Sequence, residues 1–267
     1  DASSAVCAIT SLTESSETSE QLATLFLLEP DSDSPIATFP TTENLLEIIG
    51  YDGSVLSCLA SGRGLLPRVI TIDLAAGKYV QDPVIETEGA LAASDDLAYL
   101  LTSELTTDAN IVTAYDLFTG MPLDIVNLEL EPNLEIASLA WSPDASQFAY
   151  ILRERRQNSN QEAVGLGLWI YDLETQTNQQ ILDEDGAESS IVSWNPEGTY
   201  VLVEHVGLDG SKYCYAIRPD GSDRRFIVAS EDTTVLGWAT GLGDITIQIQ
   251  SDNWASQFMQ VAGDIDE

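Results

Sequence analysis

The chain offers one histidine for acid–base chemistry, His205. A serine–histidine–acid triad would have to use it, because the imidazole takes the proton from the nucleophile. No Gly-x-Ser-x-Gly nucleophile turn occurs, and His205 follows the strand-like run Tyr200 to Val203, where a loop or rim role is expected. The sequence therefore predicts that the protein is not an enzyme.

Metal and cofactor chemistry has equally little support. The cysteines have no zinc-ligand spacing, and neither a Walker loop nor a dinucleotide-binding glycine fingerprint occurs. Adjacent carboxylates such as Asp95-Asp96 indicate a solvated surface in a chain with 44 acidic residues. We expect no metal and no cofactor. Cys58 and Cys214 stand among apolar neighbours and are expected to be buried in strands, with one disulfide plus one free thiol as the alternative.

The charge of the chain excludes two classes of partner. Its 267 residues carry a net charge of −34, which argues against binding nucleic acid or an anionic membrane surface. No apolar run approaches the roughly 18 to 20 residues that span a bilayer. The acidic surface is typical of a protein that stays soluble in a salty habitat or outside a cell. The chain begins with Asp1 rather than Met, which would suit a mature secreted form, so an extracytoplasmic location is expected.

The elements that must position any site are revealed by a repeat. Residues 139–144 (LAWSPD) and 192–197 (VSWNPE) share a pattern, and each is followed by a strand-like run. Looser copies surround Gly50, Ala93 and Trp238, so that the equivalent positions Gly50, Ala93, Trp141, Trp194 and Trp238 are 43, 48, 53 and 44 residues apart. Such periods indicate one supersecondary unit per repeat. The repeated tryptophans are expected to fill the core between units rather than to form a carbohydrate platform.

Each unit contains strand-like segments joined by turns, and no segment has helical periodicity. The stretches that begin at Asp73, Asp116 and Asp172 lie at corresponding places between two strands, where a type I turn with a bulge is expected. A sheet of four antiparallel strands cannot bury both faces alone, so neighbouring sheets should pack face to face around an axis.

The repeat resembles two known families. Residues 141–150 (WSPDASQFAY) are similar to the repeat of TolB-type propellers, and residues 168–173 (LWIYDL) resemble the strand that ends WD-type repeats. The resemblance covers about residues 44–250. It implies a single all-β propeller of four-stranded antiparallel blades, with six blades expected and five as the alternative. Residues 1–21 are predicted to form an N-terminal strand and an acidic Ser/Thr-rich segment, and residues 22–267 the propeller.

Propellers present loops on two faces of a rigid frame, and recognition is usually placed on such loops. We therefore expect a non-enzymatic binding or scaffolding module that engages a protein partner. The alternatives are a subunit of a surface layer or filament, and the metal-dependent lactone-type hydrolase with a central-channel site that the resemblance also implies.

The scarce positive charges suggest where a partner would bind. The segment Arg153-Glu154-Arg155-Arg156 is expected to lie in a long loop running to Gly165. Loops between second and third strands should share one face, and that face would carry six of the ten basic residues: Arg63, Arg68, Arg153, Arg155, Arg156 and Lys212. Two interpretations stay open. These residues either form local ion pairs or bind carboxylates of a partner through bidentate contacts.

Overall fold

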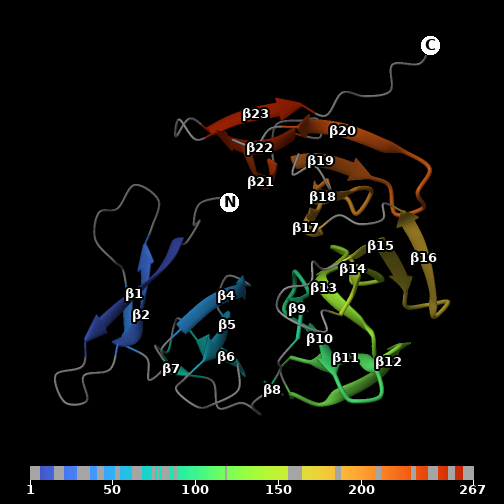
Figure 1. The fold of residues 1–267 in the computed structure, drawn as a ribbon. Helices are drawn as coiled ribbons and strands as arrows, with labels where there is room; N and C mark the ends of the chain where they lie inside the picture. Colours follow the sequence, from blue (N-terminus) through green and yellow to red (C-terminus); the bar gives the residue numbers. More distant parts are fainter. Residues whose placement is uncertain are drawn as a thin grey trace. The chain divides into compact units, whose positions relative to one another are not determined.

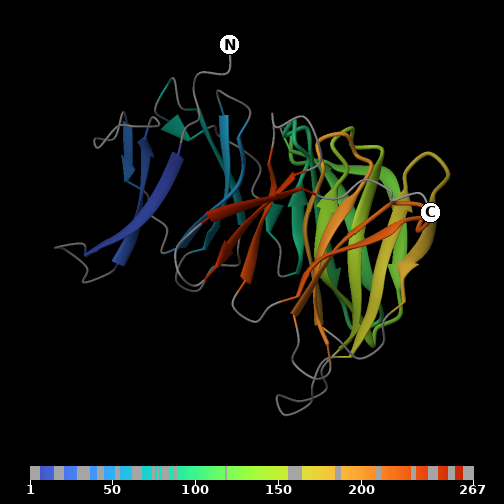
Figure 2. The same ribbon diagram turned by 90° about the horizontal axis from the view of Figure 1, so that it is seen from above.

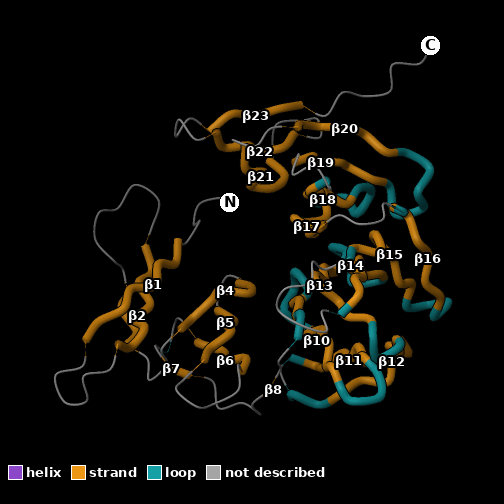
Figure 3. The backbone as a smooth tube through the Cα atoms, viewed as in Figure 1, coloured by secondary structure: helices purple, strands orange, loops and turns teal. Residues whose placement is uncertain are grey.

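The computed structural model describes most of the chain from residue 89 onward and shorter pieces before it. The described residues are 7–14, 21–28, 37–40, 45–51, 55–61, 68–73, 76, 78–79, 85–86, 89–117, 119–155, 164–183, 188–207, 212–229, 233–239, 246–251 and 256–260. Within them the chain forms strands, turns and loops, without a helix (Figure 3). No helix in this part of the chain could therefore cross a membrane.

The strands form six antiparallel sheets in chain order, as the repeat predicts (Figure 1). The first two sheets contain β1 (Cys7–Glu14), β2 (Gln21–Leu28) and β3 (Ala37–Pro40), then β4 (Leu45–Tyr51), β5 (Val55–Ser61), β6 (Arg68–Asp73), β7 (Lys78–Tyr79) and β8 (Ile85–Glu86). The next two contain β9 (Leu91–Ala93), β10 (Tyr99–Leu105), β11 (Asn110–Asp116) and β12 (Pro122–Leu130), then β13 (Leu134–Trp141), β14 (Gln147–Glu154), β15 (Gly165–Asp172) and β16 (Thr177–Leu182). The last two contain β17 (Glu188–Trp194), β18 (Val201–Val206), β19 (Lys212–Ile217) and β20 (Arg224–Ala229), then β21 (Thr233–Ala239), β22 (Thr246–Ser251) and β23 (Ser256–Gln260).

The chain packs as two compact units, each described by itself. The first holds residues 1–88 with 95–100 and 115–122, and the second holds residues 89–94, 101–114 and 123–267. The second unit therefore contains the three sheets β13–β16, β17–β20 and β21–β23 and most of β9–β12. Three of the six sheets have four strands, which confirms the predicted four-stranded antiparallel unit. The number of blades stays a prediction.

One strand near the start of the chain differs from the prediction. Residues 11–14 were expected in a loop, but they belong to β1, where Ser11 pairs with Thr24 and Glu14 with Gln21. Pairing with the apolar strand β2 overrides the weak strand propensity of these polar residues. The last strand expected in the second unit, from Tyr79 to Ile85, is described only at its two ends, in β7 and β8, and residues 80–84 lie outside the described residues.

The repeated tryptophans join successive sheets of the second unit. Trp141 ends β13 and Trp194 ends β17, and both are buried at 5% and 7% exposure, which confirms the expected core role. Trp238 occupies the same place in β21 and is half-buried. Each indole N–H donates to a carbonyl on the first strand of the preceding sheet. The bonds are Trp141 to Ala92 at 3.1 Å, Trp194 to Ala140 at 3.1 Å and Trp238 to Ser193 at 3.3 Å.

Apolar side chains fill the space between the β13–β16 and β17–β20 sheets, whose strands run side by side in Figure 2. This core includes Ala149, Ile151, Leu168, Ile170, Leu182, Trp194, Val201, Val203 and Ile217. These residues alternate along their strands with residues that face the opposite side, as the period of a strand requires. Close packing fixes the two sheets against each other and so fixes the turns at their ends.

The turns at one end of the sheets repeat their chemistry as well as their length. The first residue of the β11–β12 and β15–β16 turns is an aspartate whose Oδ1 accepts bonds from the backbone N–H and the hydroxyl of a threonine three residues later. Asp116 binds Thr119 in this way at 2.7 and 2.8 Å, and Asp172 binds Thr175 at 2.8 and 2.9 Å. A residue with positive φ follows each threonine, as the expected bulge requires: Gly120 at 64° and Gln176 at 52°.

Candidate functional site

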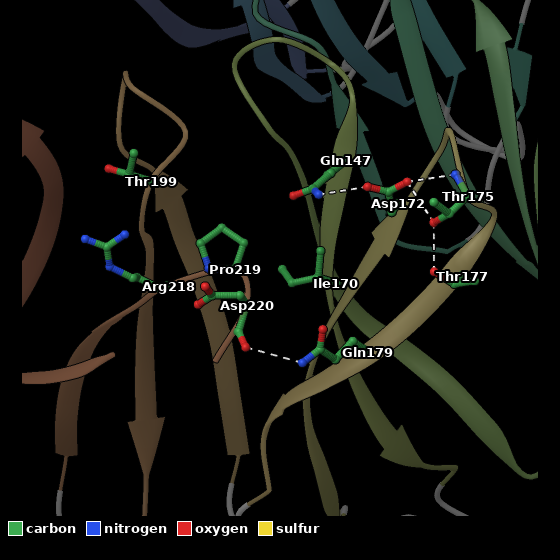
Figure 4. Close-up of a pocket in the computed structure, with 10 residues that line it drawn as sticks. All are labelled: Gln147, Ile170, Asp172, Thr175, Thr177, Gln179, Thr199, Arg218, Pro219 and Asp220. Atoms are coloured by element: carbon green, nitrogen blue, oxygen red, sulfur yellow. Dashed lines mark hydrogen bonds between the residues drawn. The ribbon is translucent and has the colours of Figure 1, made fainter. Parts of the chain in front are cut away.

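A groove of about 440 Å³ lies between the β13–β16 and β17–β20 sheets, at the end where the β13–β14, β15–β16, β17–β18 and β19–β20 turns meet (Figure 4). This volume falls within the roughly 300 to 1,000 Å³ of ligand sites. One wall consists of residues from the β13–β16 sheet and its turns: Gln147, Ile170, Asp172, Thr175, Thr177 and Gln179. The other wall consists of residues from the β17–β20 sheet and its turns: Thr199, Arg218, Pro219 and Asp220.

Asp172 organises the first wall. Its Oδ2 accepts a 3.0 Å hydrogen bond from Nε2 of Gln147, the first residue of β14. Its Oδ1 accepts the two bonds from Thr175 that close the β15–β16 turn, and the Thr175 hydroxyl lies 2.8 Å from that of Thr177. The backbone N–H of Thr175, followed by the Gln147 amide, lowers the pKa of the Asp172 carboxyl. Asp172 therefore carries a negative charge at neutral pH.

One hydrogen bond connects the two walls. Gln179 on β16 donates from Nε2 to the backbone oxygen of Asp220 at 3.3 Å. Asp220 lies in the β19–β20 turn, where Gly221 has a φ of 72° and packs against Ile181. A side chain other than glycine would be strained at that φ. The backbone of this turn therefore lies directly against β16, so the groove is formed by fixed elements.

A second polar cluster surrounds Arg218 of the other wall. Asp223 accepts hydrogen bonds from the Tyr200 hydroxyl at 2.6 Å and from Nε of Arg225 at 2.8 Å. Arg218 and Arg225 both lie over the Tyr200 ring, at 5.2 and 5.1 Å from its centroid. The bond from Tyr200, followed by that from Arg225, lowers the pKa of Asp223. In Figure 4 the Arg218 guanidinium points away from Gln147 and Asp172.

The predicted basic residues do not form one cluster. Arg153, expected in a loop, lies in β14 and pairs with Glu135 of β13 both in backbone register and through a side-chain ion pair. Its loop assignment is wrong, because pairing with β13 extends β14 to Glu154. Arg155 follows β14 and is exposed, with its backbone N–H bound to Asn133.

The other predicted contacts fall elsewhere. Arg68 begins β6, and the exposed Lys212 begins β19. Neither is thus in the loop where it was expected. Arg63 and Arg156 lie outside the described residues. Arg155 and Lys212 are at the ends of β14 and β19 opposite the groove, because Gln147 begins β14 and Arg218 follows β19. The groove and the two residues Arg155 and Lys212 are therefore at opposite ends of the same two sheets.

His205 lies inside β18 rather than after a strand, which corrects the expected loop or rim position. Its imidazole is 5% exposed, and its Nδ1 is 2.9 Å from the Ser189 hydroxyl. The rings of Tyr213 and Tyr215 lie 6.2 and 6.3 Å away. A serine–histidine bond of this kind is used in nucleophilic catalysis; here the histidine is buried and the serine is half-buried.

The cysteines and carboxylates of the described residues add no further site. Cys58 and Cys214 are buried in strands with free thiols, as expected for both, and burial raises the pKa of each thiol to about 12. A thiol with such a pKa is unreactive at neutral pH. In the parts of the chain that the structure describes, no three His, Cys, Asp or Glu side chains are grouped so that they could hold a metal ion.

Sequence reasoning missed the groove. The repeated Asp-x-x-Thr signal marked the β15–β16 turn, but nothing in the sequence showed that Gln147 and Gln179 would meet Asp172 and Asp220. These contacts join residues 25 and 41 positions apart. Gln147 and Asp172 pair across β14 and β15 of one sheet, whereas the packing of two sheets brings Gln179 to Asp220.

Comparison with known proteins supports the fold. No family model and no curated protein matches the sequence. Among solved structures, TolB from Acinetobacter baumannii is 12% identical with a TM-score of 0.57, over 95% of this chain and 63% of TolB. The chain thus spans less than two thirds of TolB. KlAtg21, in complex with the coiled coil of AgAtg16, is 14% identical with a TM-score of 0.59, over 96% of this chain and 78% of that one.

A third similar structure comes from the nidogen/laminin complex, with 9% identity, a TM-score of 0.55, and coverage of 96% of this chain and 90% of that one. The fold is that of a β-propeller. Enzymes also occur among the similar structures, including an oligogalacturonate lyase in complex with manganese. The shared fold therefore does not decide between binding and catalysis.

Proposed function

We propose that this β-propeller is a non-enzymatic protein-binding module and that its partner contacts the groove between the β13–β16 and β17–β20 sheets. The observation that carries the proposal is the groove itself, which presents amide, hydroxyl and carboxylate groups on turns held by hydrogen bonds. Groups held in place before binding lose little conformational entropy when a partner associates.

Two further observations support a binding role. Two of the similar structures are complexes with other proteins, a coiled coil in one and laminin in the other. The histidine of this chain, which acid–base catalysis would use first, is buried beside Ser189 and lies outside the groove. The extracytoplasmic location expected from composition stays a prediction.

The proposal is tested by purifying the protein from its native source with two baits. The first is the unmodified chain, and the second carries Gln147→Leu and Thr177→Arg, which remove an acceptor from the groove and obstruct it. We expect a stoichiometric partner with the first bait and its loss with the second, at equal melting temperatures. Retention of the same partner by the second bait would place the interface elsewhere.

A further inference from the structure

We propose that the groove binds the Lys or Arg side chain of an extended basic segment of the partner protein. This inference rests on the proposed function and names the chemistry of the partner. It follows from which hydrogen-bonding atoms of the groove are already used inside the protein and which are left for a ligand.

The two glutamines of the first wall present oxygens to the groove. Nε2 of Gln147 donates to the Asp172 carboxylate, and Nε2 of Gln179 donates to the carbonyl of Asp220. Both partners are acceptors only, so the orientation of each amide is fixed by its neighbour. Neither Oε1 has a hydrogen-bond partner among the described residues. The glutamines therefore offer two acceptors to a ligand.

Asp172 adds a charged acceptor beside the Gln147 amide. Its Oδ2 accepts the bond from Gln147, whereas both bonds from Thr175 go to Oδ1. A carboxylate oxygen can accept about two hydrogen bonds, so Oδ2 can also accept one from a ligand. Two amide oxygens around a carboxylate match an ammonium or guanidinium group, which only donates hydrogen bonds.

The second wall does not neutralise this charge. The Arg218 guanidinium lies over Tyr200 and is directed away from Asp172, as Figure 4 shows. Pro219 and Ile170 instead supply apolar surface to the groove. The aliphatic stem of a lysine or arginine can pack on such surface while its charged head reaches polar groups.

The charge of the whole chain favours the same ligand. A protein of net charge −34 attracts basic segments and repels acidic ones at long range, and this increases the rate of association with a basic partner. A neutral or acidic segment would gain neither the attraction nor the pairing with Asp172.

Three blocked pentapeptides serve as probes: Gly-Gly-Arg-Gly-Gly, the same peptide with citrulline in place of arginine, and the same peptide with glutamate. Each is titrated into the 15N-labelled full chain while the amide resonances are followed. We expect the arginine peptide to shift the side-chain amides of Gln147 and Gln179 in a saturable way. The citrulline and glutamate peptides should bind at least about fivefold more weakly, because a charge-assisted bond is lost.

The chain supplies a matched control for the charge. Asp172→Asn and Asp116→Asn remove the same charge from the same kind of turn, and asparagine keeps an acceptor for the threonine in both. We expect Asp172→Asn to lower the affinity for the arginine peptide about tenfold, and Asp116→Asn to lower it less than twofold. Gln179→Leu, which leaves the charge of the protein unchanged, should lower the affinity for the arginine peptide severalfold.

Equal losses in the two aspartate variants would overturn the inference, because binding would then depend on overall charge alone. Shifts confined to other residues, absence of binding, or equal affinity for citrulline would also overturn it. Failure of the inference and of the proposed function can be told apart. A natural partner that is lost with the obstructed bait although the arginine peptide does not bind would leave the function standing with a different ligand chemistry.

Discussion

At the scale of single residues, the indole of each repeated tryptophan contributes apolar burial and one directed hydrogen bond. Trp194 lies in the core between two sheets, and its N–H reaches the carbonyl of Ala140 on the neighbouring first strand. The ring supplies area that is removed from water, whereas the bond fixes how far one sheet is displaced along the other. A smaller apolar residue would bury less apolar area and would make no hydrogen bond to the neighbouring strand.

We therefore expect Trp194→Ala to lower the free energy of unfolding by about 3 to 5 kcal/mol, the usual range for truncating a large core side chain. Trp194→Phe should cost less, about 1 to 3 kcal/mol, because it keeps most of the burial but leaves the Ala140 carbonyl without its donor. Urea denaturation of the three proteins measures both differences. A loss below about 1 kcal/mol for the alanine variant would contradict the assigned core position.

Asp223 gives a prediction on pH. Its pKa is lowered in the folded state, so its contribution to stability is full above the unfolded pKa of about 3.9 and is lost as the pH falls through the folded value. Asp223→Asn should lower the free energy of unfolding by about 1 to 2 kcal/mol near pH 7, where the bonds from Tyr200 and Arg225 are charge-assisted. The difference from the parent should shrink below about pH 4. A difference that is constant from pH 7 to 3 would exclude the charged state as its cause.

At the scale of elements, the turn after each first strand has one residue with positive φ at the same place in three units. It is Leu97 at 55°, Ala145 at 54° and Gly198 at 69°, each four residues after the repeated position. Only glycine adopts this conformation without cost, so two of the three turns are strained. The sheets on either side hold these turns in place, because the turn residues pair through backbone bonds such as Ser142 to Gln147.

Exchanging glycine and alanine at this position should have opposite consequences in two turns. Gly198→Ala is expected to lower stability by about 1 to 2 kcal/mol through conformation alone, because the added Cβ would meet Pro143 at an ordinary 3.6 Å. Ala145→Gly removes the same strain and should leave stability unchanged or slightly raised. Thermal denaturation of both variants is the measurement. A loss on Ala145→Gly larger than that on Gly198→Ala would show that the turns are not equivalent.

The elements could be predicted from the sequence and most of the contacts between them could not. The order of the strands and the turns between them follow from local signals such as the period of Trp141 and Trp194 and the Asp-x-x-Thr turns. The loop assigned to Arg153 was wrong because its partner Glu135 lies 18 residues earlier on a neighbouring strand. The groove depends on contacts between two sheets, and no local pattern encodes how Gln179 approaches Asp220.

At the scale of the whole molecule, 44 acidic residues outnumber ten basic ones, and the resulting net charge of −34 repels itself in the folded state. Salt screens the repulsion between exposed charges that are farther apart than the Debye length. This length is about 8 Å at physiological ionic strength and about 3 Å at 1 M. The same charge attracts a basic partner, so salt should stabilise the free protein and weaken the complex.

Raising sodium chloride from about 0.01 M to 1 M should therefore raise the melting temperature of the free protein, and the dissociation constant of its complex should rise over the same range. Calorimetry and equilibrium binding measure the two effects. A melting temperature that falls or stays constant would remove self-repulsion as a factor in stability. Binding that strengthens with salt would indicate an acidic partner.

The central claim is that the partner occupies the groove and not the end of the sheets that carries Arg155 and Lys212. Hydrogen–deuterium exchange of the purified complex, compared with the free protein, tests it most directly, because amides in turns exchange fast until a partner covers them. We predict slower exchange in the β15–β16 and β19–β20 turns, at residues 173–176 and 220–222, and unchanged exchange at Arg155 and Lys212. Slower exchange at Arg155 and Lys212, with unchanged exchange in the two turns, would contradict the account.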